Sequence, residues 1–166
     1  MNALEASMLG KRYRNRWALR EATFELPAGA RCALVGPNRA GKTTLLNLVT
    51  GLLVPTIGRV RVFGRPLEVS RVAFMAQDKP LYRRWSVADL LRFGAATNPR
   101  WDQHTATSFL LAHDIPIQQR ADRLSGGQRT LVALALAVGK RADLLVLDEP
   151  LAELDPWPAF GVVMLS

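Results

Sequence analysis

The sequence predicts an α/β fold, in which helices cover a mostly parallel β-sheet. Three observations predict it. A glycine-rich loop, residues 36–43, lies between an apolar strand-like run and a helix-like segment. A second apolar run, residues 143–147, is unbroken, as in a parallel strand buried on both faces. Between these two features, strand-like segments are followed by helix-like ones.

The expected strands begin with residues 17–26, which alternate loosely between polar and apolar side chains and end at a Pro-Ala-Gly turn. Residues 31–35 form the apolar run before the glycine-rich loop. Residues 58–64 alternate between two glycines, which predicts a half-buried strand in an antiparallel sheet. Residues 71–76 predict a further strand that leads to Gln77.

The expected helices have recognisable starts. Ser86 and Asp89 have the spacing of a capping box, and so do Ser125 and Gln128. In each pair the first side chain can accept a hydrogen bond from the first turn of a helix, and the second can return one. The predicted helices are residues 44–49, 87–93, 105–112 and 129–138.

Composition narrows the class of protein. The chain has 166 residues, 49% of them apolar, which is enough for one domain with a real core. No apolar run approaches the roughly 18 residues of a membrane span, and residues 1–10 lack the pattern of a signal peptide. The single cysteine, Cys32, excludes an internal disulfide and is expected to be a buried small residue. We therefore expect a cytoplasmic protein.

The net charge of +8 raises the possibility of a nucleic-acid partner. The basic residues are scattered, however, with short clusters only at residues 11–16 and 83–84, and no aromatic stacking motif accompanies them. Solvated surface charge that partly serves nucleotide phosphates is the favoured interpretation. No nucleic-acid partner is expected.

The glycine-rich loop reads G-x-x-x-x-G-K-T, the pattern of a phosphate-binding P-loop. Its glycines allow backbone N–H groups to turn toward a phosphate, and the following helix adds a favourable dipole. Lys42 would reach the β- and γ-phosphates, and the Thr43 hydroxyl would bind Mg²⁺. A chance glycine turn is the alternative for this motif alone. The nucleotide-binding residues expected here are Gly36, Asn38, Ala40, Gly41, Lys42, Thr43 and Thr44.

Two carboxylates, Asp148 and Glu149, follow the buried apolar run. The first could hold the Mg²⁺ that Thr43 contacts, and the second could polarise an attacking water as general base. Alone, two acids at a strand end would indicate a solvated loop. Together with the P-loop they favour a catalytic site.

The stretch Leu124-Ser125-Gly126-Gly127-Gln128 is the most specific motif in the chain. Its capping box starts a helix, and the Ser-Gly-Gly start exposes backbone donors and a helix dipole to a phosphate. Scaffold and anion site are therefore compatible roles for the same residues.

In this order, the P-loop, Gln77, Leu124-Ser125-Gly126-Gly127-Gln128 and Leu147-Asp148-Glu149-Pro150 resemble the nucleotide-binding domain of the ABC ATPases, over residues 4–155. The resemblance implies a P-loop NTPase fold: a RecA-like core, an antiparallel β piece and a helical signature subdomain. We expect a single domain over residues 1–166. Its expected parts are a core (1–77 and 130–155), a helical subdomain (about 78–129) and a divergent tail (156–166).

The resemblance also implies roles for individual residues. Tyr13 would stack on the adenine of ATP, with Trp17 as the alternative. Gln77 would contact Mg²⁺ or the attacking water and sense the membrane partner. Residues 154–155 resemble the loop that crosses the interface of a head-to-tail dimer, in which Ser125, Gly126, Gly127 and Gln128 bind the ATP of the second nucleotide-binding domain.

Residues 77–82 and 86–87 look like the transporter branch of this family. That likeness implies an ATP-binding subunit that hydrolyses Mg-ATP to drive transport through a membrane-spanning subunit, at the inner face of the cell membrane. Two alternatives are a non-transport ABC ATPase in DNA repair or translation, which the positive charge suggests, and a nucleotide-binding chain that does not hydrolyse ATP.

The sequence departs from the family pattern in three places, and the first two are substitutions in the P-loop and in the helix after the signature. Arg39 stands where the family's P-loop has glycine, and if this position needs a positive φ, a side chain there costs about 1 kcal/mol. A long cation near the phosphates could instead strengthen binding. Leu131 and Leu136 replace arginines, which makes the helix after the signature almost wholly apolar and predicts its burial.

The third departure is at the C-terminus. The sequence runs 17 residues past Glu149 (166 − 149), whereas in the family a further core strand delivers a switch histidine. We expect a chain truncated after residue 155, with that core strand missing and residues 160–165 partly filling the gap. His104 and His113 precede the signature and are expected to be ordinary polar residues.

Overall fold

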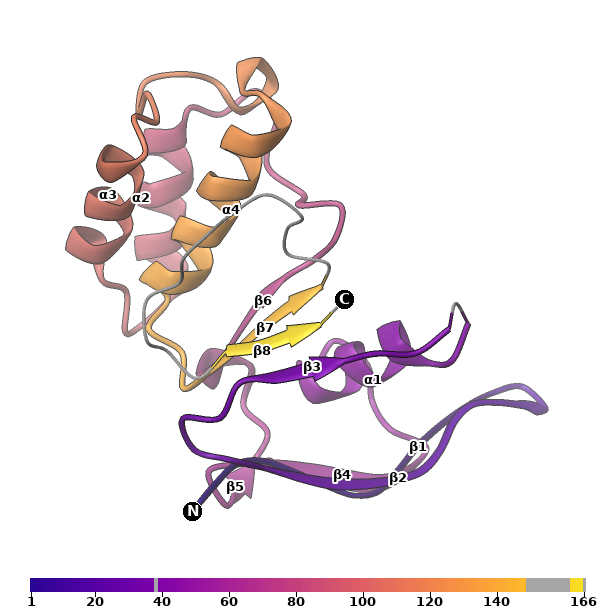
Figure 1. Ribbon diagram of the computed structural model, residues 1–166. Coiled ribbons are helices and arrows are strands. Elements are labelled where there is room, and N and C mark those ends of the chain that lie inside the picture. The colour runs from indigo at the N-terminus through magenta and orange to yellow at the C-terminus, as the bar shows by residue number, and fades with distance from the viewer. Residues whose placement is uncertain (38, 149–161, 166) are drawn as a thin grey trace.

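The structure is a computed structural model that describes residues 1–37, 39–148 and 162–165. The described strands form two sheets. In Figure 1, helix α1 (Lys42–Val49) lies between the sheets, and a helical layer of α2 (Val87–Thr97), α3 (Gln103–Ala112) and α4 (Gly126–Gly139) lies beyond the second sheet. Short 3₁₀ turns are η1 (Val69–Arg71) and η2 (Ala121–Arg123). No helix in the described part of the chain combines the length and apolar character needed to cross a membrane.

The first sheet is antiparallel, with strand order β2-β1-β4-β5. Its strands are β1 (Asn2–Tyr13), β2 (Arg16–Pro27), β4 (Ile57–Val62) and β5 (Arg65–Pro66). The expected strands at residues 17–26 and 58–64 are confirmed, and the second of them is antiparallel as predicted. Sequence reasoning missed β1, whose register shifts interrupt the regular alternation of buried and exposed residues.

The second sheet is parallel, with strand order β3-β8-β7-β6. Its strands are β3 (Cys32–Leu34), β6 (Val72–Met75), β7 (Leu144–Asp148) and β8 (Val162–Leu165). All four residues from Leu144 to Leu147 are buried, as the unbroken apolar run predicts. Cys32 is only half-buried, contrary to expectation, because β3 is the outermost described strand of this sheet.

The C-terminal segment occupies the centre of the parallel sheet. Strand β8 pairs with β3 on one side, where Cys32 lies opposite Val163, and with β7 on the other, where Leu147 lies opposite Met164. The expectation that residues 160–165 fill this position as a strand is confirmed for residues 162–165, while residues 160 and 161 lie outside the described residues. The position between β3 and β7 is therefore occupied, and the backbone groups of both strands have a partner there.

Alternate residues of the parallel strands face two separate cores. Val72, Leu144 and Val146 pack with α1 and the antiparallel sheet. Ala73, Leu145 and Leu147 pack with α4 on the opposite face. This two-residue period is the pattern of a strand covered on both sides. Helix α4 has no exposed residue from Thr130 to Gly139, as its apolar sequence predicts.

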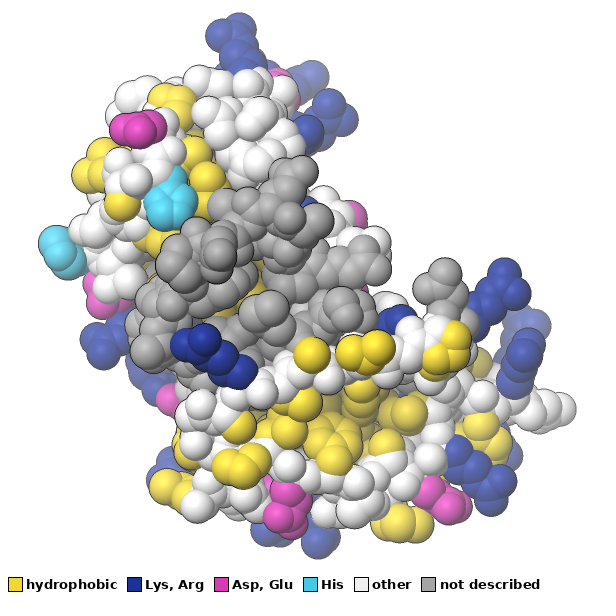
Figure 2. Space-filling view, viewed as in Figure 1, with side chains coloured by type: hydrophobic (Ala, Val, Ile, Leu, Met, Phe, Trp, Pro, Cys, Tyr) yellow, Lys and Arg dark blue, Asp and Glu magenta, His cyan; other side chains and the backbone are white. Residues whose placement is uncertain are grey.

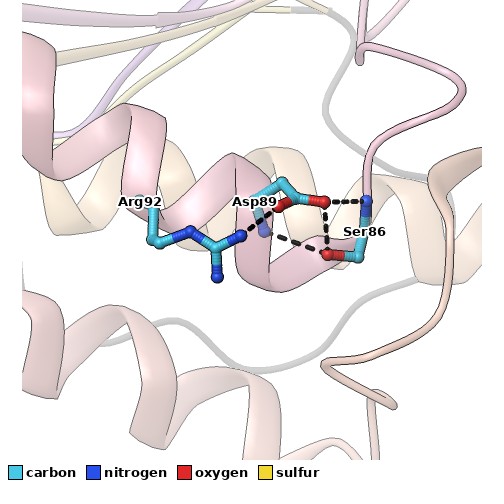
Figure 3. A network of polar contacts seen from close by, with 3 residues as sticks. All are labelled: Ser86, Asp89 and Arg92. Atoms are coloured by element: carbon cyan, nitrogen blue, oxygen red, sulfur yellow. Dashed lines mark hydrogen bonds and ion pairs between the residues drawn. The ribbon is translucent and has the colours of Figure 1, made fainter.

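Helix α2 begins at the predicted capping box, which Figure 3 shows from close by. The Asp89 N–H donates to Ser86 Oγ at 3.1 Å, and the Ser86 N–H donates to Asp89 Oδ2 at 2.9 Å. Arg92, one turn further along, donates to the other oxygen of Asp89. Hydrogen bonds from the Ser86 side chain and backbone lower the pKa of Asp89. The Ser125 box at the start of α4 is likewise confirmed.

The helices pack closely around Trp101, in the loop between α2 and α3. A Cβ atom added to Gly94 of α2 would lie 2.5 Å from the Trp101 ring, and one added to Gly139 of α4 would lie 2.9 Å from it. Both glycines therefore allow a close approach that any side chain would block.

An ion-pair cluster that we call the Asp143 clasp joins the helical layer to the parallel sheet. Asp143, just before β7, accepts hydrogen bonds from Arg71 Nε at 2.5 Å and from Arg100 Nη1 at 3.0 Å. Arg71 ends η1, and Arg100 lies between α2 and α3. Burial alone would raise the pKa of Asp143, but the hydrogen bonds from Arg100 and Arg71 outweigh it and hold the pKa below its ordinary value.

Candidate functional site

A cleft of about 680 Å³ opens beside the N-terminus of α1. Three parts of the chain line it: the end of the β1–β2 hairpin, the loop between β3 and α1, and the carboxyl ends of β6 and β7. The volume suits a nucleotide-sized ligand. The lining residues are Tyr13, Arg16, Trp17, Ala18, Leu34, Arg39, Gly41, Lys42, Thr43, Thr44, Leu46, Gln77 and Asp148.

The loop between β3 and α1 has the backbone that a P-loop requires. Gly41, the N-cap of α1, has a φ of 88°, and a Cβ atom there would lie 2.5 Å from the Ala18 carbonyl oxygen. Only glycine fits this position without strain. Because Gly41 has no side chain, it cannot cap the first N–H groups of α1, which suits an anion at the helix N-terminus.

Lys42 is the first residue of α1 and faces the cleft. Its Nζ donates a hydrogen bond to the carbonyl oxygen of Gly36, at the other end of the same loop. The loop is thus closed over its own lysine. Gly36 and Ala40 lie in this loop but are not among the residues that line the cleft, and Asn38 lies outside the described residues.

Arg39 has a φ of 69°, so the condition under which a side chain is costly at this position, a positive φ, is met. An arginine costs about 1 kcal/mol there relative to glycine. The residue also lines the cleft, which places a second cation beside Lys42.

The carboxyl ends of β6 and β7 bring three oxygen-bearing side chains to the same place. Met75 lies opposite Leu147 in the parallel register, so Gln77 and Asp148 leave the sheet at neighbouring points. Both line the main cleft with Thr43, and the same three residues line a smaller hollow of about 470 Å³. A hydroxyl, an amide oxygen and a carboxylate are hard donors of the kind that Mg²⁺ prefers, so the residues fit this ion. Glu149 lies outside the described residues.

Two aromatic side chains, Tyr13 and Trp17, line the cleft from the hairpin. Tyr13 is 49% exposed, with Lys11 Nζ 5.6 Å from the centre of its ring. Trp17 is half-buried, and the guanidinium groups of Arg12 and Arg20 lie within 6 Å of its ring, at 5.7 and 5.9 Å. The rings offer a flat surface at the cleft edge.

Sequence reasoning missed Arg16 and Ala18 as parts of the site. The hairpin register pairs Tyr13 with Arg16, which brings the two side chains to one end of the sheet. The cluster of basic residues at 11–16 was the available signal, but without β1 it had no position in the fold.

The signature residues lie outside this cleft. Ser125 and Gln128 complete the capping box of α4, where the Gln128 N–H donates to Ser125 Oγ at 3.2 Å and the Ser125 N–H donates to Gln128 Oε1 at 2.9 Å. Gly126 borders a separate hollow that also includes Gln77, while nothing lies within 4 Å of a Cβ added to Gly126 or Gly127. The helix start is therefore open to an outside ligand. His104 and His113 are exposed and line neither hollow.

The comparisons with known proteins agree with this arrangement. A family profile described as "ABC transporter" matches residues 19–152. The Fe(3+) ions import ATP-binding protein FbpC of Pseudomonas fluorescens is 35% identical over 93% of this chain and 47% of its own length. The sulfate/thiosulfate import ATP-binding protein CysA of Escherichia coli K12 is 34% identical over 92% of this chain and 46% of its own. The chain thus spans about half the length of these curated relatives.

Solved structures share the fold. A structure described as the ATP binding subunit of an ABC transporter aligns with a TM-score of 0.84 and 24% identity, over 93% of this chain and 69% of its own. The protein cbiO1 from Clostridium perfringens, part of the ABC transporter complex cbiONQ, aligns with a TM-score of 0.75 and 26% identity, over 93% of this chain and 68% of its own.

Proposed function

The chain belongs to the ABC transporter family, and we propose that it is an ATP-binding subunit that binds Mg-ATP in the P-loop cleft and hydrolyses it to drive transport through a membrane-spanning partner. One observation carries the proposal: the adjacent Lys42 and Thr43 line a single cleft with Asp148, which is far from them in the sequence. Relatives with about 35% identity are ATP-binding proteins of import systems, which supports the same role here.

Each part of the cleft has a role in this proposal. Lys42 and the N–H groups at the start of α1 hold the phosphate chain. Tyr13 stacks on the adenine, with Trp17 as the alternative. Glu149, which follows Asp148 in the sequence, would activate the attacking water as general base, and Gln77 would contact Mg²⁺ or the same water.

Thr43, Gln77 and Asp148 are the residues that would hold Mg²⁺. When bound, the ion neutralises part of the phosphate charge. Their hydroxyl, amide and carboxylate oxygens supply the donor set, and they approach from α1, β6 and β7. Three separately anchored groups can keep the terminal phosphate in a fixed orientation, which is the main requirement of phosphoryl transfer.

We further propose that the signature residues act in trans. Ser125, Gly126 and Gly127 lie at an open helix start outside the chain's own cleft. In a head-to-tail pair, this start would contact the nucleotide of a second nucleotide-binding domain. The position of the open helix N-terminus supports the proposal.

The membrane-spanning partner would dock on the helical layer, which would hold the subunit at the inner face of the cell membrane. Tyr82, Trp85 and Phe93 form a contiguous aromatic cluster there, with Tyr82 stacked on Trp85 at 4.4 Å. They are 55%, 37% and 42% exposed. A contiguous exposed aromatic surface is typical of a protein–protein contact.

Titration calorimetry with Mg-ATP tests the proposed function. The full chain should bind Mg-ATP saturably, and Lys42→Ala should abolish binding while the far-UV circular dichroism spectrum is unchanged. Removal of Mg²⁺ should weaken ATP binding by the original chain but should change ATP binding by Asp148→Asn only a little. A folded chain that does not bind Mg-ATP, or a Lys42→Ala variant that binds it normally, would refute the proposal.

A further inference from the structure

Arg39 is a surface cation held in an unusual backbone conformation at the phosphate loop. Its φ of 69° lies in the region that favours glycine, yet the position carries the longest basic side chain available. Arg39 faces the same cleft as Lys42 and Asp148. Glycine at this position would remove the strain. A role for Arg39 in the site therefore has to come from its side chain.

The charge of the cleft indicates what the Arg39 side chain contributes. Three cations line it, Arg16, Arg39 and Lys42, against one described carboxylate, Asp148. Lys42 already donates to the loop carbonyl of Gly36. No ion pair or side-chain hydrogen bond joins Arg39 to another residue of the described chain, so its guanidinium is available to an anion. Figure 2 shows that basic side chains gather at this end of the molecule, around the hairpin and the loop.

We propose that Arg39 is a second phosphate-binding cation of the cleft and that it makes the cleft select the nucleotide with the longer, more highly charged phosphate chain. This inference rests on the proposed function, because it assumes that the cleft binds nucleotide phosphates. A guanidinium is planar, always charged and able to donate two parallel hydrogen bonds to one phosphate. It contributes most where the ligand carries a terminal phosphate and least where that group is absent.

Three substitutions at Arg39 separate its charge from its backbone strain. Arg39→Gly removes both charge and strain, Arg39→Gln removes the charge and retains the strain, and Arg39→Lys retains both. Arg59→Gln is the matched control, because Arg59 is an exposed arginine of β4 that does not line the cleft. Calorimetric titration of each variant with Mg-ATP and with Mg-ADP gives the ratio of the two affinities.

We expect Arg39→Gly and Arg39→Gln to weaken Mg-ATP binding about tenfold, as for the loss of a charged hydrogen bond. Mg-ADP binding should change less than about threefold, so the affinity ratio should fall. Arg39→Lys should keep much of the ratio, and Arg59→Gln all of it. Arg39→Gly alone should raise the unfolding midpoint by about 2–4 °C, because it alone relieves the backbone strain.

The outcomes distinguish this inference from the proposed function. An unchanged ATP-to-ADP ratio in both Arg39→Gly and Arg39→Gln, with binding lost in Lys42→Ala, would overturn the role of Arg39 and leave the nucleotide site intact. Normal binding in Lys42→Ala would refute the nucleotide site itself, and the role of Arg39 with it. An equal loss in Arg59→Gln would show a general charge effect and would also overturn the inference.

Discussion

Removal of the Asp143 carboxylate tests the clasp, which joins the starts of β6 and β7 through Arg71 and holds the loop between α2 and α3 to them through Arg100. Arg71, Arg100 and Asp143 come from three segments, so Asp143→Ala deletes the shared acceptor of the clasp. The side chains of Arg71 and Asp143 are only 17% and 23% exposed, whereas that of Arg100 is 47% exposed. The two arms of the clasp should therefore contribute unequally.

The magnitude follows from this difference in exposure. A hydrogen bond between charged groups contributes about 1.5–3 kcal/mol when it is shielded, which describes the arm to Arg71. The arm to Arg100 is screened by solvent and contributes at most about 1 kcal/mol. Nη1 of Arg71 is already buried without a partner among the described residues, so the loss of Asp143 would leave this guanidinium still less satisfied. We expect Asp143→Ala to lower the free energy of unfolding by about 2–3 kcal/mol.

Urea unfolding followed by far-UV circular dichroism measures the effect, with Arg100→Ala as the matched control from the same cluster. In a thermal melt of a chain of this size, the same loss corresponds to a fall in the unfolding temperature of about 5–10 °C. Arg100→Ala should cost no more than about 1 kcal/mol. If the two variants are destabilised equally, to within about 0.5 kcal/mol, the assignment of the stabilising arm to Arg71 is wrong.

The remaining predictions concern pH and local packing. Because the folded pKa of Asp143 is lowered from 3.8, its contribution should be complete above the unfolded pKa and be lost as the pH falls through the folded one. The free energies of unfolding of the original chain and of Asp143→Asn should therefore converge in acid. A constant difference between them down to pH 2 would contradict this. Gly94→Ala should destabilise the chain by about 1–3 kcal/mol because its Cβ would meet Trp101, whereas Gly126→Ala, which meets nothing, should not; thermal melts compare the two. Ser86→Ala should cost about 1 kcal/mol through loss of the cap of α2, measured by urea unfolding, and an unchanged midpoint would show that the cap is dispensable.

Local patterns in the sequence were sufficient for most of the elements. The capping boxes at Ser86 and Ser125 depend on residues three apart, and the buried run before Asp148 depends on continuous apolar residues. The P-loop was recognisable because its glycines and Lys42 lie within one short stretch, residues 36–42. The loop pattern also identified Arg39 as a departure from glycine, while its positive φ is a finding of the structure. These features are encoded within one turn or one strand, so the sequence alone could specify them.

Strand β1 and the half-buried state of Cys32 could not be predicted in this way. The register shifts of β1 hide its alternation, and only pairing with β2 and β4 on either side holds it in the sheet. The exposure of Cys32 depends on β3 being the outermost described strand, which is a property of strand order rather than of residues 31–35.

The sequence determined one part of the site, and the tertiary structure determined the other. The sequence determined which residues could bind a phosphate or a metal ion, because that depends on the chemistry of Lys42, Thr43, Gln77 and Asp148. Only the tertiary structure decided that they meet, since parallel pairing of β6 with β7 brings their carboxyl ends to the start of α1. It also decided that Arg16 joins them and that Ser125 does not, because distances between segments far apart in the chain are set by packing and not by local pattern.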